Sequence, residues 1–196
     1  MVEKTEILKS AIHTFANLGI KRVSIDDLCF NLSISKKTFY QHYHEKQALI
    51  NDFIAAEFQP IFDEYDRLKG LKSPLEIMIR FNQFLMDLVQ TKNPAVLHDL
   101  KQFYPENYEV YHEYRSRLMR VFQEILESGI ISGHFRKEID AKSLAALRVS
   151  QLESVLIPYP LAETKSAQYH EQIFEHYIYG IAGYLGMGRF PDASSN

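Results

Sequence analysis

The chain has 196 residues, of which 46% are hydrophobic and 24% charged, and its formal net charge is −3. This hydrophobic share is sufficient for a packed core, which argues against disorder, and the single cysteine excludes an internal disulfide. The charge is uneven, because residues 1–50 carry seven Lys and Arg against five Asp and Glu, whereas the remainder carries fifteen against twenty. A basic N-terminal part (residues 1–50, here called the head) followed by an acidic remainder (the body) is typical of a protein that contacts nucleic acid locally. The net negative charge argues against a protein that coats nucleic acid.

The first predicted helix covers residues 5–18. Its apolar residues recur at spacings of three and four, and Gly19 is a typical C-terminal stop. Helix-spaced apolar residues also follow Ser24. Ser24 with Asp27 three residues later has the pattern of a capping box, so a short second helix is expected to begin there.

A third helix is predicted after a tight turn, with Ser35 as its N-cap. Phe39 and Tyr43 are four residues apart, so both are expected to pack inward. The opposite side of this helix then carries cations for phosphates and polar tips for base edges in a major groove. These outward residues are Lys36, Lys37, Thr38, Tyr40, Gln41 and His42.

The three predicted helices have the order of a helix-turn-helix domain. The stretch ILKSAIHTFANLGIKRVSIDDLCFNLSISKKTFYQHYHEKQALI resembles the N-terminal domain of the tetracycline-repressor (TetR) family of bacterial transcription regulators. It departs from the family pattern at Ser33 and Lys37, where glycine is usual. Serine in a left-handed turn costs about 1 kcal/mol relative to glycine, and Lys37 adds charge to the reading face.

The resemblance implies a role for individual head residues. Those at phosphate-holding positions are Ser24, Thr38, Tyr40 and Lys46, and those at base-facing positions are Lys36, Lys37 and His42. Ser35 and Gln41 complete the predicted DNA-binding set.

The remainder of the chain has helical periodicity throughout, with breaks at glycine and at proline-containing caps. We predict an all-α fold with about nine helices: a helix-turn-helix DNA-binding domain over residues 1–47 and a helical effector-binding and dimerisation domain over residues 48–196. The predicted body helices cover residues 45–69, 73 to about 92, 93–104, 105–128, 140–157 and 164–185.

The last two predicted helices have apolar faces broader than one intrachain contact requires, and the final one contains glycines that cost up to about 1 kcal/mol each in a helix. Close approach of another helix is a natural compensation, although an intrachain core with loosely packed glycines is the alternative. In the TetR family the last two helices form a four-helix bundle with the partner subunit, so a homodimer is expected. The predicted interface residues are Leu152, Val155, Tyr177, Gly180, Gly183 and Tyr184.

The body also holds most of the aromatic residues of the chain. Several tyrosines share one stripe of the helix that starts at Pro105, and buried tyrosine hydroxyls need partners, so this stripe forms either core or the lining of a pocket for a small molecule. The predicted pocket residues are Phe62, Phe81, Phe84, Tyr104, Tyr108, Tyr111 and Phe122.

Other chemistry has little support in the sequence. The eight histidines show no metal-ligand spacing, no catalytic motif is present, and Cys29 falls on the buried side of the second helix, so no metal, no cofactor and no enzymatic activity are expected. The N-terminus lacks the pattern of a signal peptide and no apolar run is long enough for a membrane span, so a cytoplasmic protein is expected.

The function predicted from these features is that of a DNA-binding transcriptional regulator. It would act as a repressor on palindromic double-stranded operator DNA and be released by a small-molecule effector. The alternatives are an architectural or cell-division DNA-binding factor without an effector, and a small helical enzyme.

Overall fold

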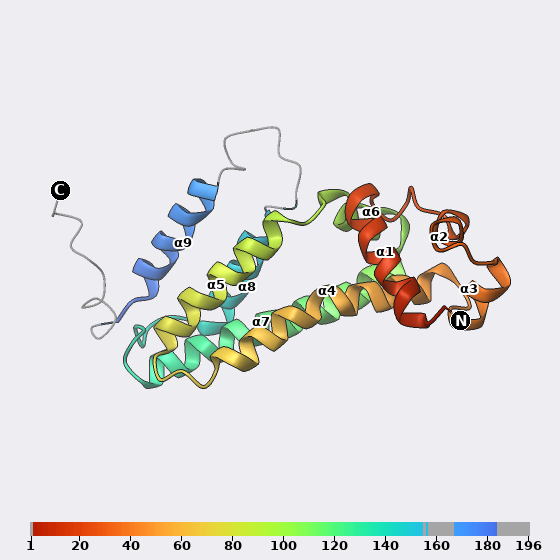
Figure 1. Cartoon of the computed structure of the whole chain (residues 1–196). Helices are drawn as coiled ribbons and strands as arrows, with labels where there is room; N and C mark the ends of the chain where they lie inside the picture. Colours follow the sequence, from red (N-terminus) through yellow and green to blue (C-terminus); the bar gives the residue numbers. More distant parts are fainter. Residues whose placement is uncertain (1, 155, 157–166, 184–196) are drawn as a thin grey trace. The chain divides into compact units, whose positions relative to one another are not determined.

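The structure, a computed structural model, describes residues 2–154, 156 and 167–183. Within these ranges the chain forms nine helices, and its only β-type pairing is an isolated antiparallel bridge between Phe135 and Ala182 (Figure 1). The all-α prediction is confirmed. The predicted interface residues Val155 and Tyr184 lie outside the described residues.

The head consists of α1 (Lys4–Leu18), α2 (Ile25–Leu32) and α3 (Lys36–His42), followed by α4 (Lys46–Leu68). α1 ends at Gly19, whose φ of 80° is favourable for glycine, as the sequence indicated. Five helices follow: α5 (Pro74–Gln90), α6 (Pro94–Phe103), α7 (Pro105–Ile131), α8 (Ala141–Ser154) and α9 (Ala167–Ile181). None of the helices in the described ranges is long and apolar enough to cross a membrane.

The helix that starts at Pro105 was expected to end before Gly129, but α7 continues through Gly129 to Ile131. A Cβ atom at Gly129 would collide with the ring of Phe135, which is only 2% exposed. Gly129 is therefore a packing site for an aromatic ring, and it does not mark the helix end.

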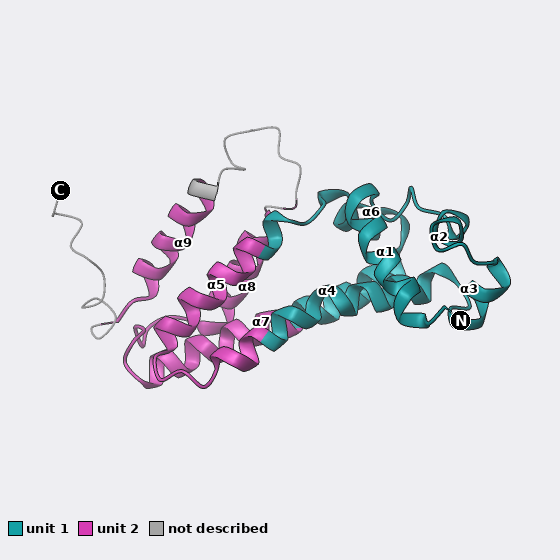
Figure 2. Ribbon diagram, viewed as in Figure 1, with its two compact units in different colours: residues 1–63, 88–116 teal, residues 64–87, 117–196 magenta. Residues whose placement is uncertain are grey.

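The chain divides into two compact units (Figure 2). Unit 1 comprises residues 1–63 and 88–116, and unit 2 comprises residues 64–87 and 117–196. The head shares unit 1 with most of α4, with α6 and with the first part of α7. The domain boundary predicted after residue 47 therefore falls inside unit 1. As a division between a DNA-binding part and an effector-binding part, it stays a prediction.

Each unit has an aromatic core. In unit 1 the rings of Phe15 and Phe53 meet edge to face with centroids 5.3 Å apart, and this contact fastens α1 to α4. In unit 2 the ring of Phe81 packs against those of Phe122 and Tyr65, at 5.4 and 5.8 Å. These contacts are formed by the helix-spaced apolar residues that predicted the helices.

Candidate nucleic-acid interface

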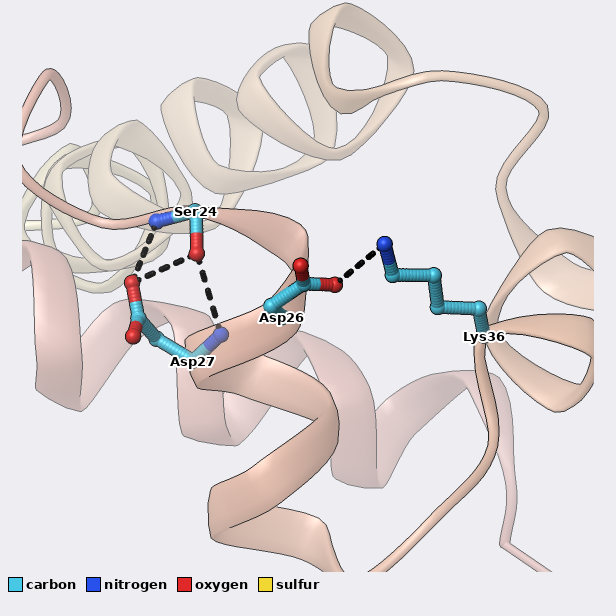
Figure 3. Close-up of polar contacts among 4 residues, drawn as sticks. All are labelled: Ser24, Asp26, Asp27 and Lys36. Atoms are coloured by element: carbon cyan, nitrogen blue, oxygen red, sulfur yellow. Dashed lines mark hydrogen bonds and ion pairs between the residues drawn. The ribbon is translucent and has the colours of Figure 1, made fainter.

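The start of α2 is fixed by reciprocal hydrogen bonds between Ser24 and Asp27 (Figure 3). The Asp27 backbone N–H donates to Ser24 Oγ at 3.1 Å, while Ser24 N–H and Oγ–H donate to Asp27 Oδ2 at 2.8 and 2.7 Å. These bonds to the ionised carboxylate lower the pKa of Asp27. The predicted capping box is present, and it leaves Ser24 exposed at the surface of the head.

The turn between α2 and α3 is left-handed at Ser33, where φ is 53° and ψ is 41°. The chain therefore adopts the conformation for which the family pattern uses glycine. The N–H of Ile34 donates to the carbonyl of Cys29 at 3.0 Å, which closes the turn. Cys29 is 5% exposed and burial raises its pKa, in agreement with its assignment to the core.

Ser35 caps α3 by accepting a hydrogen bond from Thr38 N–H at 3.1 Å. Phe39 and Tyr43 are 0% and 2% exposed, and the Tyr43 hydroxyl donates to Asp52 on α4 at 3.0 Å. The inward face of α3 is thus anchored as predicted. Lys36, Lys37, Tyr40 and Gln41 are exposed, and Thr38 and His42 are half-buried.

Lys36 is held by an acid that the sequence analysis did not single out. Its Nζ lies 2.7 Å from Asp26 Oδ1 of α2, an ion pair between two exposed side chains (Figure 3). The hydrogen bond to Asp26 raises the pKa of Lys36. In the free protein Asp26 therefore neutralises one of the cations predicted to face the DNA.

Asp26→Asn is expected to tighten DNA binding by about threefold to tenfold at low salt, because it removes a negative charge from the reading side and frees Lys36 for the duplex. The slope of log affinity against log salt should steepen by up to about 0.9, the increment for one additional phosphate contact. Fluorescence anisotropy at several salt concentrations measures both quantities. Asp66→Asn, which breaks an equally exposed ion pair with Lys69 in unit 2, is the matched control. Equal effects of the two substitutions would contradict this role for Asp26.

Lys46 points toward other residues of unit 1. Its Nζ donates to the carbonyl of Ile20 at 2.7 Å and to the Tyr104 hydroxyl at 2.9 Å, so it connects α4 to the end of α1 and to the residue between α6 and α7. The phosphate contact that the resemblance implies would require the side chain to leave these partners. That contact stays a prediction.

α6 is also fastened to the head within unit 1. Asp99, which is 7% exposed, accepts a hydrogen bond from Lys21 N–H at 2.8 Å. A Cβ at Gly19 would lie 2.8 Å from the same Asp99 carboxylate oxygen, so glycine is required there by this contact as well as by its φ. The loop that leads into α2 therefore rests on α6. No local pattern marks Asp99 for this role, because its partners are 78 and 80 positions away in the chain.

The predicted pocket residues are distributed over both units. In unit 1, Phe62 is 3% exposed and its ring lies 6.4 Å from that of Tyr114, while the rings of Tyr108 and Tyr111 stack at 5.8 Å. Tyr104, also in unit 1, accepts the Lys46 hydrogen bond. In unit 2, Phe81 and Phe122 are 0% exposed and Phe84 is half-buried. Phe62, Phe81 and Phe122 have the contacts of core residues. A ligand pocket on this stripe stays a prediction.

A cavity of about 730 Å³ does lie in unit 2, and none of the predicted pocket residues lines it. It is bordered by α8, α9 and the segment between α7 and α8. Its lining residues are Arg136, Ile139, Asp140, Ser143, Leu144, Leu147, Gln151, Ile173, His176, Tyr177, Gly180 and Ile181. No local pattern in the sequence predicts this cavity, since residues of three separate segments form its walls.

The described residues of the predicted dimer interface have different environments. Leu152 and Tyr177 are 4% and 6% exposed within the chain, and the Tyr177 hydroxyl donates to the carbonyl of Leu144 at 3.3 Å. Gly180 is exposed, with open space where a Cβ would be. Gly183 is closely packed, but against its own chain: a Cβ there would lie 2.9 Å from the carbonyl oxygen of Gly133. Intrachain packing thus explains Gly183 without a subunit crossing.

Comparison with known proteins agrees with this architecture. No protein-family model matches the sequence. The HTH-type transcriptional repressor KstR2 of Rhodococcus jostii is 22% identical over 144 residues, which are 71% of this chain and 71% of that protein. KstR2 of Mycolicibacterium smegmatis is 24% identical over 148 residues, which are 70% of this chain and 69% of that protein.

Solved structures extend the similarity over almost the whole chain. A TetR-family regulator from Cytophaga hutchinsonii superposes with a TM-score of 0.75 at 15% identity, over 91% of this chain and 94% of its own. At such identity the superposition establishes the fold. The curated relatives are both named as HTH-type transcriptional repressors, and the capped helix-turn-helix agrees with that similarity. The chain is similar in sequence to the KstR2 repressors and has the fold of TetR-family transcriptional regulators.

Proposed function

We propose that the protein is a homodimeric transcriptional repressor that binds a palindromic operator and leaves it when a small molecule occupies the chain outside the head. The observation that carries this proposal is the reading face of α3. It is a short helix with a capped start, an anchored inner side and an outer side of exposed Lys36, Lys37, Tyr40 and Gln41. The curated relatives, both named as repressors, support the direction of regulation.

Dimerisation is part of the proposal because one three-helix head reads only a half-site. A two-fold dimer places two recognition helices about one DNA turn, roughly 34 Å, apart. The exposed side of α9 around Gly180 is the part of the predicted interface that is open to a partner. Neither alternative function, an architectural factor or a helical enzyme, has a specific supporting observation, and no group of side chains in the described residues could hold a metal ion.

The direct test is an electrophoretic mobility shift with the DNA upstream of the protein's own gene, with and without a metabolite extract. A specific shift that the extract reverses is expected. No shift on this DNA, or on a random-sequence library subjected to selection, would count against DNA binding. A shift that no extract changes would favour the architectural alternative.

Lys37→Ala is expected to relax specificity at a few operator positions by about 1–3 kcal/mol, because Lys37 is exposed on α3 and the resemblance implies a base-facing role for it. Its effect on non-specific binding should be small. Affinities for the operator and for single-base variants, measured at one salt concentration, give the result. A uniform loss on every sequence would assign Lys37 to the phosphates instead.

A further inference from the structure

The C-terminal end of α3, the reading helix, is held by side chains of two other helices of unit 1. Tyr43, the C-cap of α3, donates from its hydroxyl to Asp52 Oδ2 of α4 at 3.0 Å. The same carboxylate oxygen lies 2.7 Å from Lys4 Nζ at the start of α1. That ammonium group lies 4.8 Å from the centroid of the Tyr43 ring. Each of the three side chains therefore contacts the other two, and we call this set the Lys4–Asp52–Tyr43 clasp.

The hydroxyl group of Tyr43 is not needed to fill the core. Tyr43 is 2% exposed, and its ring centroid lies 5.9 Å from that of Phe39. Phenylalanine at position 43 would bury the same ring without a polar atom that requires a partner. Burial and the hydrogen bond to Asp52 raise the pKa of Tyr43 far above its usual range, so the hydroxyl stays protonated and donates at neutral pH. The hydroxyl therefore adds a directed contact between the end of α3 and α4.

α3 depends on tertiary contacts for its orientation. It has seven residues, and an isolated helix of two turns is not stable in water. At its N-terminal end the ion pair of Lys36 with Asp26 attaches it to α2, but these side chains are 60% and 64% exposed, and such pairs contribute little. The carboxylate of the clasp is 37% exposed and its tyrosine is buried. The polar attachment at the C-terminal end is thus less accessible to water and is expected to be the stronger of the two.

We propose that Asp52 is a positioning residue for DNA recognition, which acts through the Tyr43 hydroxyl by fixing the direction of α3. Hydrogen bonds to base edges require accurate distances and angles, whereas attraction to phosphates tolerates changes of orientation. The clasp should therefore affect binding to the operator far more than binding to unrelated DNA. The inference rests on the proposed function, since it concerns how the reading face is presented to an operator.

Tyr43→Phe, which removes only the hydroxyl group, is the first test. We expect affinity for the operator to fall by about tenfold, and affinity for a random-sequence duplex to change by less than about twofold. If α3 keeps the reading orientation about one third of the time in each head, a dimer that needs both heads loses about ninefold. Fluorescence anisotropy on the full chain, with an operator selected from a random-sequence library, gives the ratio of the two affinities. A smaller folded fraction would lower both affinities equally and leave this ratio unchanged.

Tyr65→Phe is the matched control. The Tyr65 hydroxyl donates to Glu124 Oε2, also at 3.0 Å, but both residues belong to unit 2, so the ratio should not change. Asp52→Ala should lower the ratio as Tyr43→Phe does, and the double variant should lower it no further, since both substitutions remove the same hydrogen bond. Asp52→Asn keeps an acceptor oxygen for the hydroxyl and should regain at least about threefold of the ratio.

Four results would overturn the proposal: an unchanged ratio in Tyr43→Phe, an equal loss in Tyr65→Phe, single losses that multiply in the double variant, or no recovery in Asp52→Asn. The unaltered protein separates this proposal from the proposed function. If it selects no preferred sequence from the library, the proposed function fails. If it selects an operator and the ratio is the same after Tyr43→Phe, only the role of the clasp fails.

Discussion

Replacing Gly183 with leucine is expected to lower the free energy of unfolding by about 2–4 kcal/mol. A Cβ at this position would lie 2.9 Å from the carbonyl oxygen of Gly133 and 3.0 Å from the carbonyl carbon and oxygen of Phe135. These are backbone atoms, so they cannot rotate aside as a side chain could. Gly183 N–H also donates to the carbonyl of His134 at 2.7 Å, and a displaced α9 would lose that bond. Urea unfolding followed by far-UV circular dichroism measures the change.

Gly180→Leu is the matched control, three residues earlier in the chain. No heavy atom lies within 4 Å of a Cβ built there, so this variant should fold and gain up to about 1 kcal/mol from better helix propensity. If two subunits meet at this exposed part of α9, the same leucine should yield a folded monomer with weak operator affinity. Light scattering distinguishes the outcomes. A stable Gly183→Leu protein would contradict the packing argument, and a dimeric Gly180→Leu protein would move the interface elsewhere.

Removal of the Asp99 carboxylate is expected to destabilise unit 1 and weaken operator binding in the absence of any effector. Asp99→Ala leaves the N–H of Lys21 without its acceptor, which costs about 1.5–3 kcal/mol for a hydrogen bond to a charged group. The segment after Gly19 leads directly to the cap of α2, so its displacement should disturb the reading helices. Urea unfolding and operator titration of the same preparation measure the two effects.

Two further variants separate this contact from a general loss of charge. Asp99→Asn keeps an acceptor oxygen and should recover part of both the stability and the operator affinity. Asp63→Ala removes an exposed carboxylate of the same unit, which accepts a hydrogen bond from the Gln59 amide at 2.7 Å, and should change neither. Operator affinity of Asp99→Ala equal to that of the unaltered protein would mean that α6 does not position the head.

The sequence by itself determined the helices and the turn of the head. Helix caps such as Ser24 and Ser35, the stop at Gly19 and the left-handed turn at Ser33 depend on interactions over three to five residues, and the structure contains all of them. The inward positions of Phe39 and Tyr43 follow from helical periodicity, which is equally local. The fold class was predictable for this reason, whereas the family was suggested by the resemblance of the N-terminal stretch.

Only the tertiary structure decided which side chains meet across the chain. Asp99 and Lys21 are 78 positions apart, and Lys46 is 26 positions from Ile20, whose carbonyl it contacts. The sequence predicted a helix end at Gly129 and a contact between subunits at Gly183. A glycine in a sequence can indicate close packing, but it does not show which atoms pack against it, and both glycines pack against residues of their own chain. The burial of Arg148 was likewise hidden, since arginine is usually exposed and its partners come from α5, α8 and α9. Local patterns specify backbone conformation, whereas the position of each charge depends on contacts that form only when the helices pack.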